Sequence, residues 1–286
     1  MNVTIGIPFY NNEKTLHSAI NSVIYQTFKD WKLILIDDGS SDNSLHIAKK
    51  LAATDERITV ISDGKNKGLV ARLNQIIDLA NEDYIARMDA DDIMLPERIQ
   101  KQLEVFKKKS DLDVVATAAY TIDENDNPIG IKDAEAIDTT DPKSVFRKSL
   151  LIHPSILVKS SWFKKNKYDK DYFRAEDYEL WCRTFAYTNF HRIEEPLLLY
   201  REGNVSIKNY VASMKTLRKI FRVHGVDILT KREIIKAIAS THLKSAIYKV
   251  FGFFSMQYVL TANRNSTLSM TQKNEIKAFV NKINKD

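Results

Sequence analysis

Uncharged apolar runs alternate with segments of helical periodicity through the first half of the chain. Val3–Phe9 is a β-branched run without charge, which is typical of a buried strand. The next segment, 13–26, places its apolar residues at the spacing of an amphipathic helix. The alternation continues, with strands predicted at 33–36, 58–61, 84–88 and 114–118 and helices at 44–53, 69–80 and 96–107. This pattern predicts an α/β fold with a mostly parallel central sheet flanked by helices.

The regular alternation breaks at an acidic, turn-rich stretch over 120–142, which predicts a hairpin and a loop. It resumes with a short strand at 156–158, a helix at 177–187 and a strand at 197–200. From residue 206 the pattern is helical to the end. We therefore predict a sheet domain over 1–205 and a helical C-terminal extension over 206–286.

The positive charge of the chain is concentrated in this extension. Residues 214–286 contain fourteen Lys/Arg and four Asp/Glu, whereas the preceding residues contain twenty-nine Lys/Arg and thirty-three Asp/Glu. A basic segment beside an acidic body favours an anionic partner surface, either membrane lipid or nucleic acid; a solvated lysine-rich helix is the alternative. A charge-free run over 250–263 is shorter than the ~20 residues of a spanning helix, and it fits a buried or an interfacial helix.

Cysteine content and the first residues bear on the compartment. Cys182 is the only cysteine, which excludes an internal disulfide and fits a reducing environment. The chain starts without the basic and then apolar segments of a secretion signal. We expect a cytoplasmic protein, with peripheral attachment to the inner face of the membrane through 214–286 as a hypothesis.

Three carboxylates follow the apolar run 84–88 within four residues, at Asp89, Asp91 and Asp92. Like charges this close repel one another, and a bound cation relieves the repulsion. The carboxyl end of a strand is also where open α/β sheets bind ligands. Asp89 and Asp91 are therefore candidates to hold a divalent metal against a phosphorylated substrate, and an ordinary acidic turn is the alternative.

Polar side chains also follow the three earlier strands. Tyr10 and Asn11 follow the first strand, Asp38 the second, and Asn66 and Arg72 the third. In a parallel sheet these turns meet at one edge, where an aromatic ring, a carboxylate and a cation suit a base and its diphosphate. Each turn alone is an ordinary loop. The chain has neither a P-loop nor a G-x-G-x-x-G motif, which argues against an ATPase or a dinucleotide enzyme.

Together these segments resemble the family 2 glycosyltransferases of the GT-A fold over about residues 1–205. The resemblance rests on six motifs in order: Ile7-Pro8-Phe9-Tyr10-Asn11, Gln26-Thr27-Phe28, Ile36-Asp37-Asp38-Gly39-Ser40-Ser41-Asp42, Asn66-x-Gly68-x-x-x-Arg72-x-Asn74, Met88-Asp89-Ala90-Asp91-Asp92 and Ala175-Glu176-Asp177-Tyr178-Glu179-Leu180-Trp181-x-Arg183. No single motif is specific, but their order and spacing together are.

The resemblance implies a role for each matching residue. Asp91 would bind Mn²⁺ or Mg²⁺, Asp89 the ribose or the metal, and Asp177 would be the base for the acceptor hydroxyl. The nucleotide-sugar site would comprise Pro8, Tyr10, Asn11, Asp38, Asn66, Arg72, Asp89 and Glu176. Independently, a helix N-terminus keeps an aspartate ionised and able to accept a proton, although acidic residues at helix starts also merely stabilise helices.

The resemblance further implies an inverting glycosyltransferase that uses a nucleotide-sugar donor, a UDP-sugar in our expectation. Its acceptor would be a glycan, linked to a lipid diphosphate, in surface polysaccharide or O-antigen assembly, and no nucleic-acid partner is expected. One alternative is a sugar-phosphate nucleotidyltransferase, which usually has a glycine-rich signature near the first strand that this chain lacks. Another is a non-catalytic nucleotide- or nucleic-acid-binding protein that uses the basic extension.

Overall fold

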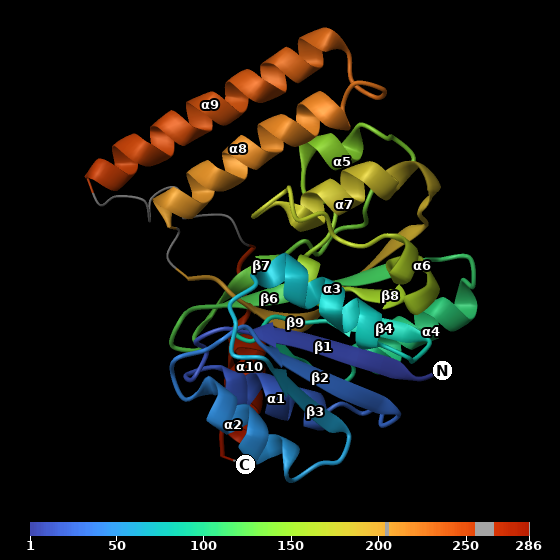
Figure 1. Ribbon diagram of the computed structural model, residues 1–286, viewed down its shortest axis with the longest axis vertical. Coiled ribbons are helices and arrows are strands. Elements are labelled where there is room, and N and C mark those ends of the chain that lie inside the picture. The colour runs from blue at the N-terminus through green and yellow to red at the C-terminus, as the bar shows by residue number, and fades with distance from the viewer. Residues whose placement is uncertain (204–205, 255–265, 286) are drawn as a thin grey trace.

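The computed structural model describes residues 1–203, 206–254 and 266–285, and it contains one central sheet with helices on both faces (Figure 1). Its strands are β1 (Val3–Phe9), β2 (Trp31–Asp37), β3 (Ile58–Ser62), β4 (Tyr84–Arg87), β5 (Ile93–Met94), β6 (Val114–Ile122), β7 (Pro128–Lys132), β8 (Leu157–Lys159) and β9 (Phe190–Arg201). They are arranged in the order β3-β2-β1-β4-β8-β6-β9-β5, with β7 paired to β6. The predicted α/β fold is confirmed.

The helices follow the predicted pattern except for α5 (Ser144–Arg147) and α6 (Ser160–Lys165), two short helices that the sequence analysis did not predict. The others are α1 (Leu16–Ile24), α2 (Ser44–Ala52), α3 (Leu69–Leu79), α4 (Arg98–Lys108), α7 (Glu176–Thr184), α8 (Ile207–Val223), α9 (Lys231–Phe253) and α10 (Met270–Ile283). The helix predicted over 177–187 ends at Thr184 and continues as a 3-10 turn over Phe185–Tyr187. The strand predicted over 197–200 is longer, because β9 pairs with β6 on both sides of a register shift near Pro196.

The sheet has two halves of different character. β3, β2, β1 and β4 are all parallel, so their carboxyl ends meet at one edge. Beyond β4 the pairing is mixed: β8 runs antiparallel to both β4 and β6, whereas β6 and β9 are parallel. The parallel half therefore brings together the polar turns that the sequence placed after its strands.

Each face of the sheet is buried under its own layer of helices. α3, α6 and α7 cover one face, and α1, α2 and α4 cover the other. β1 and α3 come unusually close, since a Cβ at Gly6 would lie 2.4 Å from Cγ2 of Ile76. Burial of both faces explains why the parallel strands are continuous apolar runs rather than alternating ones.

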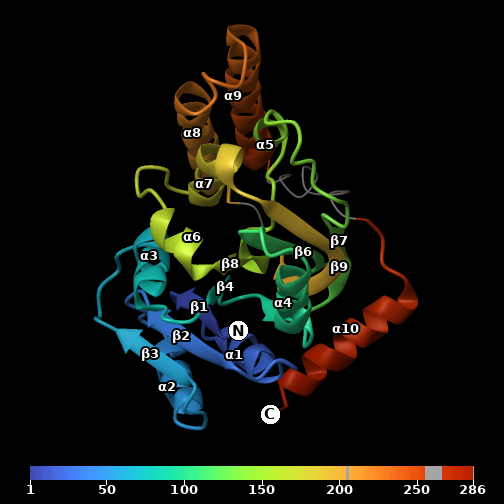
Figure 2. The same ribbon diagram turned by 90° about the vertical axis from the view of Figure 1, so that its right-hand side faces the viewer.

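The three C-terminal helices occupy two separate places. α8 and α9 lie side by side beyond α5 and α7, at the end of the molecule away from β1–β3 (Figure 1). α10 returns to the sheet, where Ile276, Val280 and Ile283 pack against β5, β6 and β9 (Figure 2). Asn21 Nδ2 of α1 also donates to the carbonyl of Ile283 at 2.8 Å. The domain boundary at residue 206 stays a prediction.

The charge-free run predicted over 250–263 is described only in its first part. Residues 250–253 form the end of α9, Phe254 is its C-cap, and the rest of the run lies outside the described residues. Within the described ranges, no helix is both long enough and apolar enough to cross a membrane.

Candidate active site

A cavity of about 1100 Å³ opens at the carboxyl ends of the parallel strands. Residues from the turns after β1, β2 and β4 line it, together with the start of α3 and the start of α7. Eight of the ten predicted site residues are among them: Pro8, Tyr10, Asp38, Arg72, Asp89, Asp91, Glu176 and Asp177. The fold thus brings six of these residues from positions 8–91 and two from the start of α7 to one cavity. The role of each residue in binding or catalysis stays a prediction.

Asn11 and Asn66 are the two predicted residues that do not line this cavity. Asn11 has a left-handed backbone, with φ of 54°, and its Oδ1 accepts a hydrogen bond from the Ser41 amide at 2.8 Å. It therefore ties the turn after β1 to the turn after β2, and the adjacent Asn12 lines the cavity instead. Asn66 is exposed in the loop before α3.

Arg72 is fully buried beneath the turn that precedes α3. Its Nε donates to Asp38 at 2.8 Å, Nη2 to Asp63 at 2.7 Å and Nη1 to Gln75 at 2.9 Å. Two carboxylates and one amide oxygen of the protein thus occupy the guanidinium. The bonds to Asp63 and Asp38 raise the pKa of Arg72, and the bonds from Arg72 and Lys67 lower the pKa of Asp63. Arg72 thus positions Asp38, and its predicted place near the nucleotide remains a prediction.

Asp38 closes the loop that starts α3. Besides Arg72, it accepts hydrogen bonds from the backbone amides of Lys67, at 2.7 Å, and of Gly68, at 3.0 Å. Gly68 has φ of 84°, a left-handed conformation that glycine adopts without steric cost. The network holds a nearly buried carboxylate at the cavity wall, where it can accept a hydrogen bond from a base.

The carboxylates of Asp89, Asp91 and Asp92 converge after β4, with one oxygen of each within 4.8 Å of the others. Burial and the charge of Asp89 raise the pKa of Asp91 to about 6, and the same causes raise the pKa of Asp92 well above its ordinary value. Asp92 Oδ2 is buried, and no group in the described parts of the chain forms a hydrogen bond with it. This set of crowded oxygen donors fits a divalent ion such as Mg²⁺ or Mn²⁺.

Arg201 at the end of β9 fixes this acidic loop. Its amide donates to Asp92 Oδ1 at 2.9 Å and its Nε donates to the carbonyl of Asp91 at 2.8 Å. Its Nη2 forms an ion pair with Asp126 of the β6–β7 turn at 2.6 Å. The strand that ends in Arg201 therefore holds the candidate metal ligands in place from the far half of the sheet.

Arg87 is a site residue that the sequence analysis missed. It lies in β4, is only 4% exposed and forms an ion pair with Asp89. Its Nε and Nη1 have no hydrogen-bond partner among the described residues, although the residue lines the cavity. The signal was present in the sequence, because Arg87 is the one charged residue in an otherwise uncharged strand, and a buried charge requires a partner.

Glu176 and Asp177 enter the cavity from the first turn of α7. Burial and the charge of Asp177 raise the pKa of Glu176 to about 7. Burial also raises the pKa of Asp177, even though backbone N–H groups of the helix start oppose the shift. The predicted effect of the helix N-terminus is present, but desolvation outweighs it. A raised pKa brings a carboxylate closer to the range of an effective general base.

Helix α8 holds α7 and the preceding loop in place. The hydroxyls of Ser213 and Thr216 donate to the carbonyls of Arg174 and Phe173, at 3.1 Å and 2.8 Å. Glu179 of α7 pairs with His224, just after α8, at 3.1 Å. The position of Asp177 therefore depends on a helix from the C-terminal segment.

Comparison with known proteins places the chain among sugar-transferring enzymes. The family model described as glycosyl transferase family 2 matches residues 4–192. An uncharacterized glycosyltransferase of Methanocaldococcus jannaschii is 37% identical over 217 residues, covering 74% of each chain. The putative glycosyltransferase EpsE of Bacillus subtilis is 34% identical over 213 residues, covering 72% of this chain and 75% of the relative.

Solved structures show the same fold at low sequence identity. Residues 1–349 of TarS from S. aureus, in complex with UDP, superpose with a TM-score of 0.63 and 17% identity, covering 84% of this chain and 70% of that one. The mannosyltransferase PcManGT from Pyrobaculum calidifontis, in complex with GDP-Man and Mn²⁺, superposes with a TM-score of 0.60 and 11% sequence identity. The match covers 99% of this chain and 86% of that one.

Proposed function

The chain belongs to glycosyl transferase family 2, and we propose that it is an inverting enzyme that transfers a sugar from a UDP-sugar to a glycan hydroxyl. The observation that carries this proposal is the shared cavity, in which Asp89 and Asp91 of the crowded acidic cluster and the carboxylate pair from α7 face the same space. The UDP and the GDP-Man with Mn²⁺ bound to the two structural neighbours support a nucleotide-sugar donor and a metal.

In the proposed reaction, the acceptor hydroxyl attacks the anomeric carbon of the donor sugar. The bond from that carbon to the diphosphate oxygen breaks, and its electrons leave with the nucleoside diphosphate. Asp177 takes the proton of the attacking hydroxyl, so charge and atoms balance. One displacement from the face opposite the leaving group inverts the anomeric centre.

Different residues of the cavity have different roles in the proposed reaction. Tyr10, half-exposed at the rim, packs on the base, and Asp38 accepts from a base N–H. Asp91 and Asp89 hold Mn²⁺ or Mg²⁺ in the proposal. The bound metal would offset the charge of the leaving diphosphate. Arg87 interacts electrostatically with Asp89 of the acidic cluster and with Asp177, and its positive charge lowers the cost of gathering these carboxylates.

We further propose that the acceptor is a glycan linked to a lipid diphosphate in surface polysaccharide assembly, and that the protein meets it at the inner face of the membrane. Helix α9 supports this proposal. Its inner side packs on α8, and its outer side carries a stripe of exposed apolar residues at helical spacing: Ile235, Leu243, Val250, Phe253 and Phe254. Lys and Arg residues flank the stripe, which is the arrangement of an interfacial helix on anionic lipid.

Flotation with lipid vesicles tests the membrane contact. The double substitution Leu243→Ser and Phe253→Ser should abolish co-flotation with phosphatidylglycerol vesicles, because both side chains are more than 60% exposed and removed from the α8 interface. Ile129→Ser, which removes an exposed apolar residue of β7, is the matched control. Equal recovery of all three proteins would end the membrane proposal.

A donor screen that detects the released product tests the reaction itself. We expect nucleoside diphosphate to be released in the presence of Mn²⁺ or Mg²⁺ and to disappear with chelator. Asp91→Ala should remove the metal-dependent turnover while the protein still folds. Release of pyrophosphate from a nucleoside triphosphate would instead identify a nucleotidyltransferase, and salt-sensitive binding of nucleic acid without turnover would identify a binding protein.

A further inference from the structure

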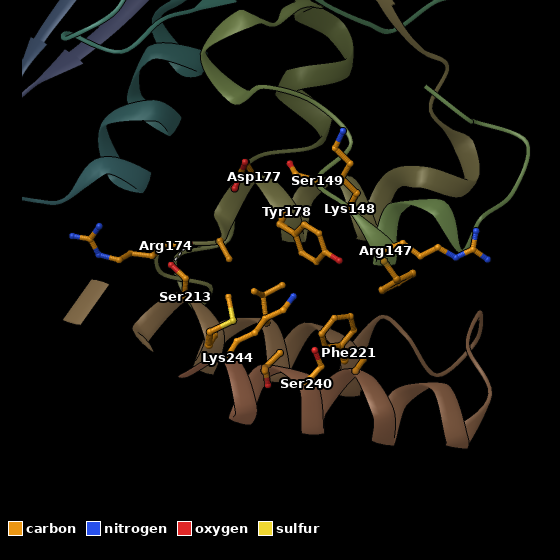
Figure 3. Close-up of a pocket in the computed structure, with 16 residues that line it drawn as sticks. Arg147, Lys148, Ser149, Arg174, Asp177, Tyr178, Ser213, Phe221, Ser240 and Lys244 are labelled. Carbon is orange, nitrogen blue, oxygen red and sulfur yellow. Dashed lines mark hydrogen bonds between the residues drawn. The ribbon is translucent and has the colours of Figure 1, made fainter. Parts of the chain in front are cut away.

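A second cavity, of about 440 Å³, lies between α9 and α8 on one side and α5 and α7 on the other (Figure 3). Helix α8 contributes an apolar wall, made of Met214, Leu217 and Phe221. Helix α9 contributes Ser240, Thr241 and Lys244. None of these residues has a part in binding the nucleotide in the function proposed above.

The two cavities meet at the candidate base. Ser149, Arg174, Asp177 and Ser213 line both of them. Figure 3 shows Asp177 at the end of the second cavity nearest the sheet domain, with Tyr178 beside it. A molecule held between α8 and α7 can therefore present a hydroxyl to Asp177, while the donor occupies the larger cavity.

The second cavity has an excess of positive charge. Asp177 is its one acidic lining residue, against four basic ones. Two of these are already neutralised, since Arg147 pairs with Asp141 at 2.9 Å and Lys148 pairs with Asp133 at 2.6 Å. The other two, Arg174 and Lys244, have no carboxylate within ion-pair distance in the described parts of the chain.

Lys244 is the better placed of the two free cations. In Figure 3 its side chain extends from α9 into the space below α7, whereas the Arg174 guanidinium turns outward at one side. Glu233 is the one acidic residue of α9, and it is engaged by Lys143 at 2.8 Å at the start of the helix. The ammonium group of Lys244 is thus available to an anion that enters the cavity.

We propose that this second cavity is the acceptor site, and that Lys244, with Arg174 at its edge, binds a phosphoryl group of the acceptor. The inference rests on the proposed function, which it deepens by naming the groups that recognise the substrate. The apolar wall from α8 would pack against the adjoining sugar, and the distance from Lys244 to Asp177 would set which hydroxyl is attacked. Two free cations favour a diphosphate over a singly charged carboxylate.

Calorimetric titration with inorganic pyrophosphate tests the site, using the full chain without metal at low salt. Lys244→Gln should weaken binding about three- to tenfold, because a charge-assisted contact is lost. Lys244→Arg should retain it. The matched control is Lys236→Gln, which removes the same charge from the same helix at a position that does not line the cavity; it should change the Kd less than about twofold.

Equal weakening by Lys244→Gln and Lys236→Gln would mean that pyrophosphate responds only to net charge, and would overturn the proposal. Tighter binding of glucuronate than of pyrophosphate would overturn the phosphoryl assignment. Release of nucleoside diphosphate by donor hydrolysis, measured without acceptor, separates this inference from the proposed function. Normal release with no Lys244 effect refutes the acceptor site alone, whereas no release from any donor by the unmodified protein refutes the proposed function.

Discussion

The two cavities that meet at Asp177 use their cations in opposite ways. In the donor cavity, Arg72 and Arg87 are buried and paired with Asp38, Asp63 and Asp89. In the second cavity, Lys244 is exposed and has no carboxylate partner within the residues described. The first set of cations serves the protein itself by holding carboxylates in place, and the second remains available to a ligand.

The difference shows what each cavity can bind. A buried ion pair leaves little net charge for a ligand, and the carboxylates of Asp91, Glu176 and Asp177, which line the donor cavity outside these pairs, can attract a metal ion. A cation on an open helix face keeps its attraction for anions. Asp177 lines both cavities, which is where a base must lie to take a proton from one substrate as it attacks the other.

The largest expected effect comes from the candidate base, which lines both cavities. Asp177→Asn should lower turnover by about 10²- to 10⁴-fold, since it removes the proton acceptor while keeping the shape of the side chain. Donor affinity, measured by titration with UDP and Mn²⁺, should change little. A loss confined to donor affinity would show that Asp177 binds the donor and is not the base.

The next prediction compares the stability effect of removing a buried, ion-paired arginine with that of removing an exposed arginine. Arg72→Met should lower the free energy of unfolding by about 3 kcal/mol, because it leaves the buried Asp38 carboxylate without its charged partner. The matched control, Arg174→Met, removes an exposed guanidinium with no carboxylate partner and should change stability by less than about 0.5 kcal/mol. Urea unfolding of both variants measures the contrast, and equal losses would contradict it.

The smallest effect concerns the carboxylate next to the base. The pKa of Glu176 is raised from 4.5 to about 7 in the folded protein, so the folded state binds more protons than the unfolded state between these values. Stability should therefore fall as the pH rises from 4.5 to 7 and stay low above it. Glu176→Gln removes this loss and should stabilise the metal-free protein by up to about 3 kcal/mol at pH 8.

Urea unfolding of wild type and Glu176→Gln at pH 4.5 and pH 8 measures this difference. The two proteins should have similar stability at the lower pH, where the carboxyl is protonated in the folded state. If the difference in stability between the two proteins were the same at both pH values, Glu176 would not titrate in this range.

The sequence predicted the parallel half of the fold because its signals are local. A buried parallel strand must be a continuous apolar run, and the polar turns after β1, β2 and β4 follow from their position at the carboxyl ends. The acidic cluster after β4 was predicted from spacing alone. Local patterns did not reveal β5, which is two residues long, or the full length of β9, whose charged middle interrupts the apolar run.

Charge pairing and helix placement depended on the tertiary structure. The sequence indicated a cation at Arg72 but not its ion pairs with Asp38 and Asp63, because those two partners come from separate turns, after β2 and β3. It also predicted the helix N-terminal effect on Asp177 but not the burial that outweighs it.

By itself, then, the sequence determined the α/β fold, the family and the list of candidate carboxylates, since periodicity and motif spacing are properties of neighbouring residues. Only the tertiary structure decided which cations are paired, and that α8 and α9 build a second cavity at Asp177. The reason is physical: burial and ion pairing depend on side chains that are distant in the sequence, and they become defined only when the chain is packed.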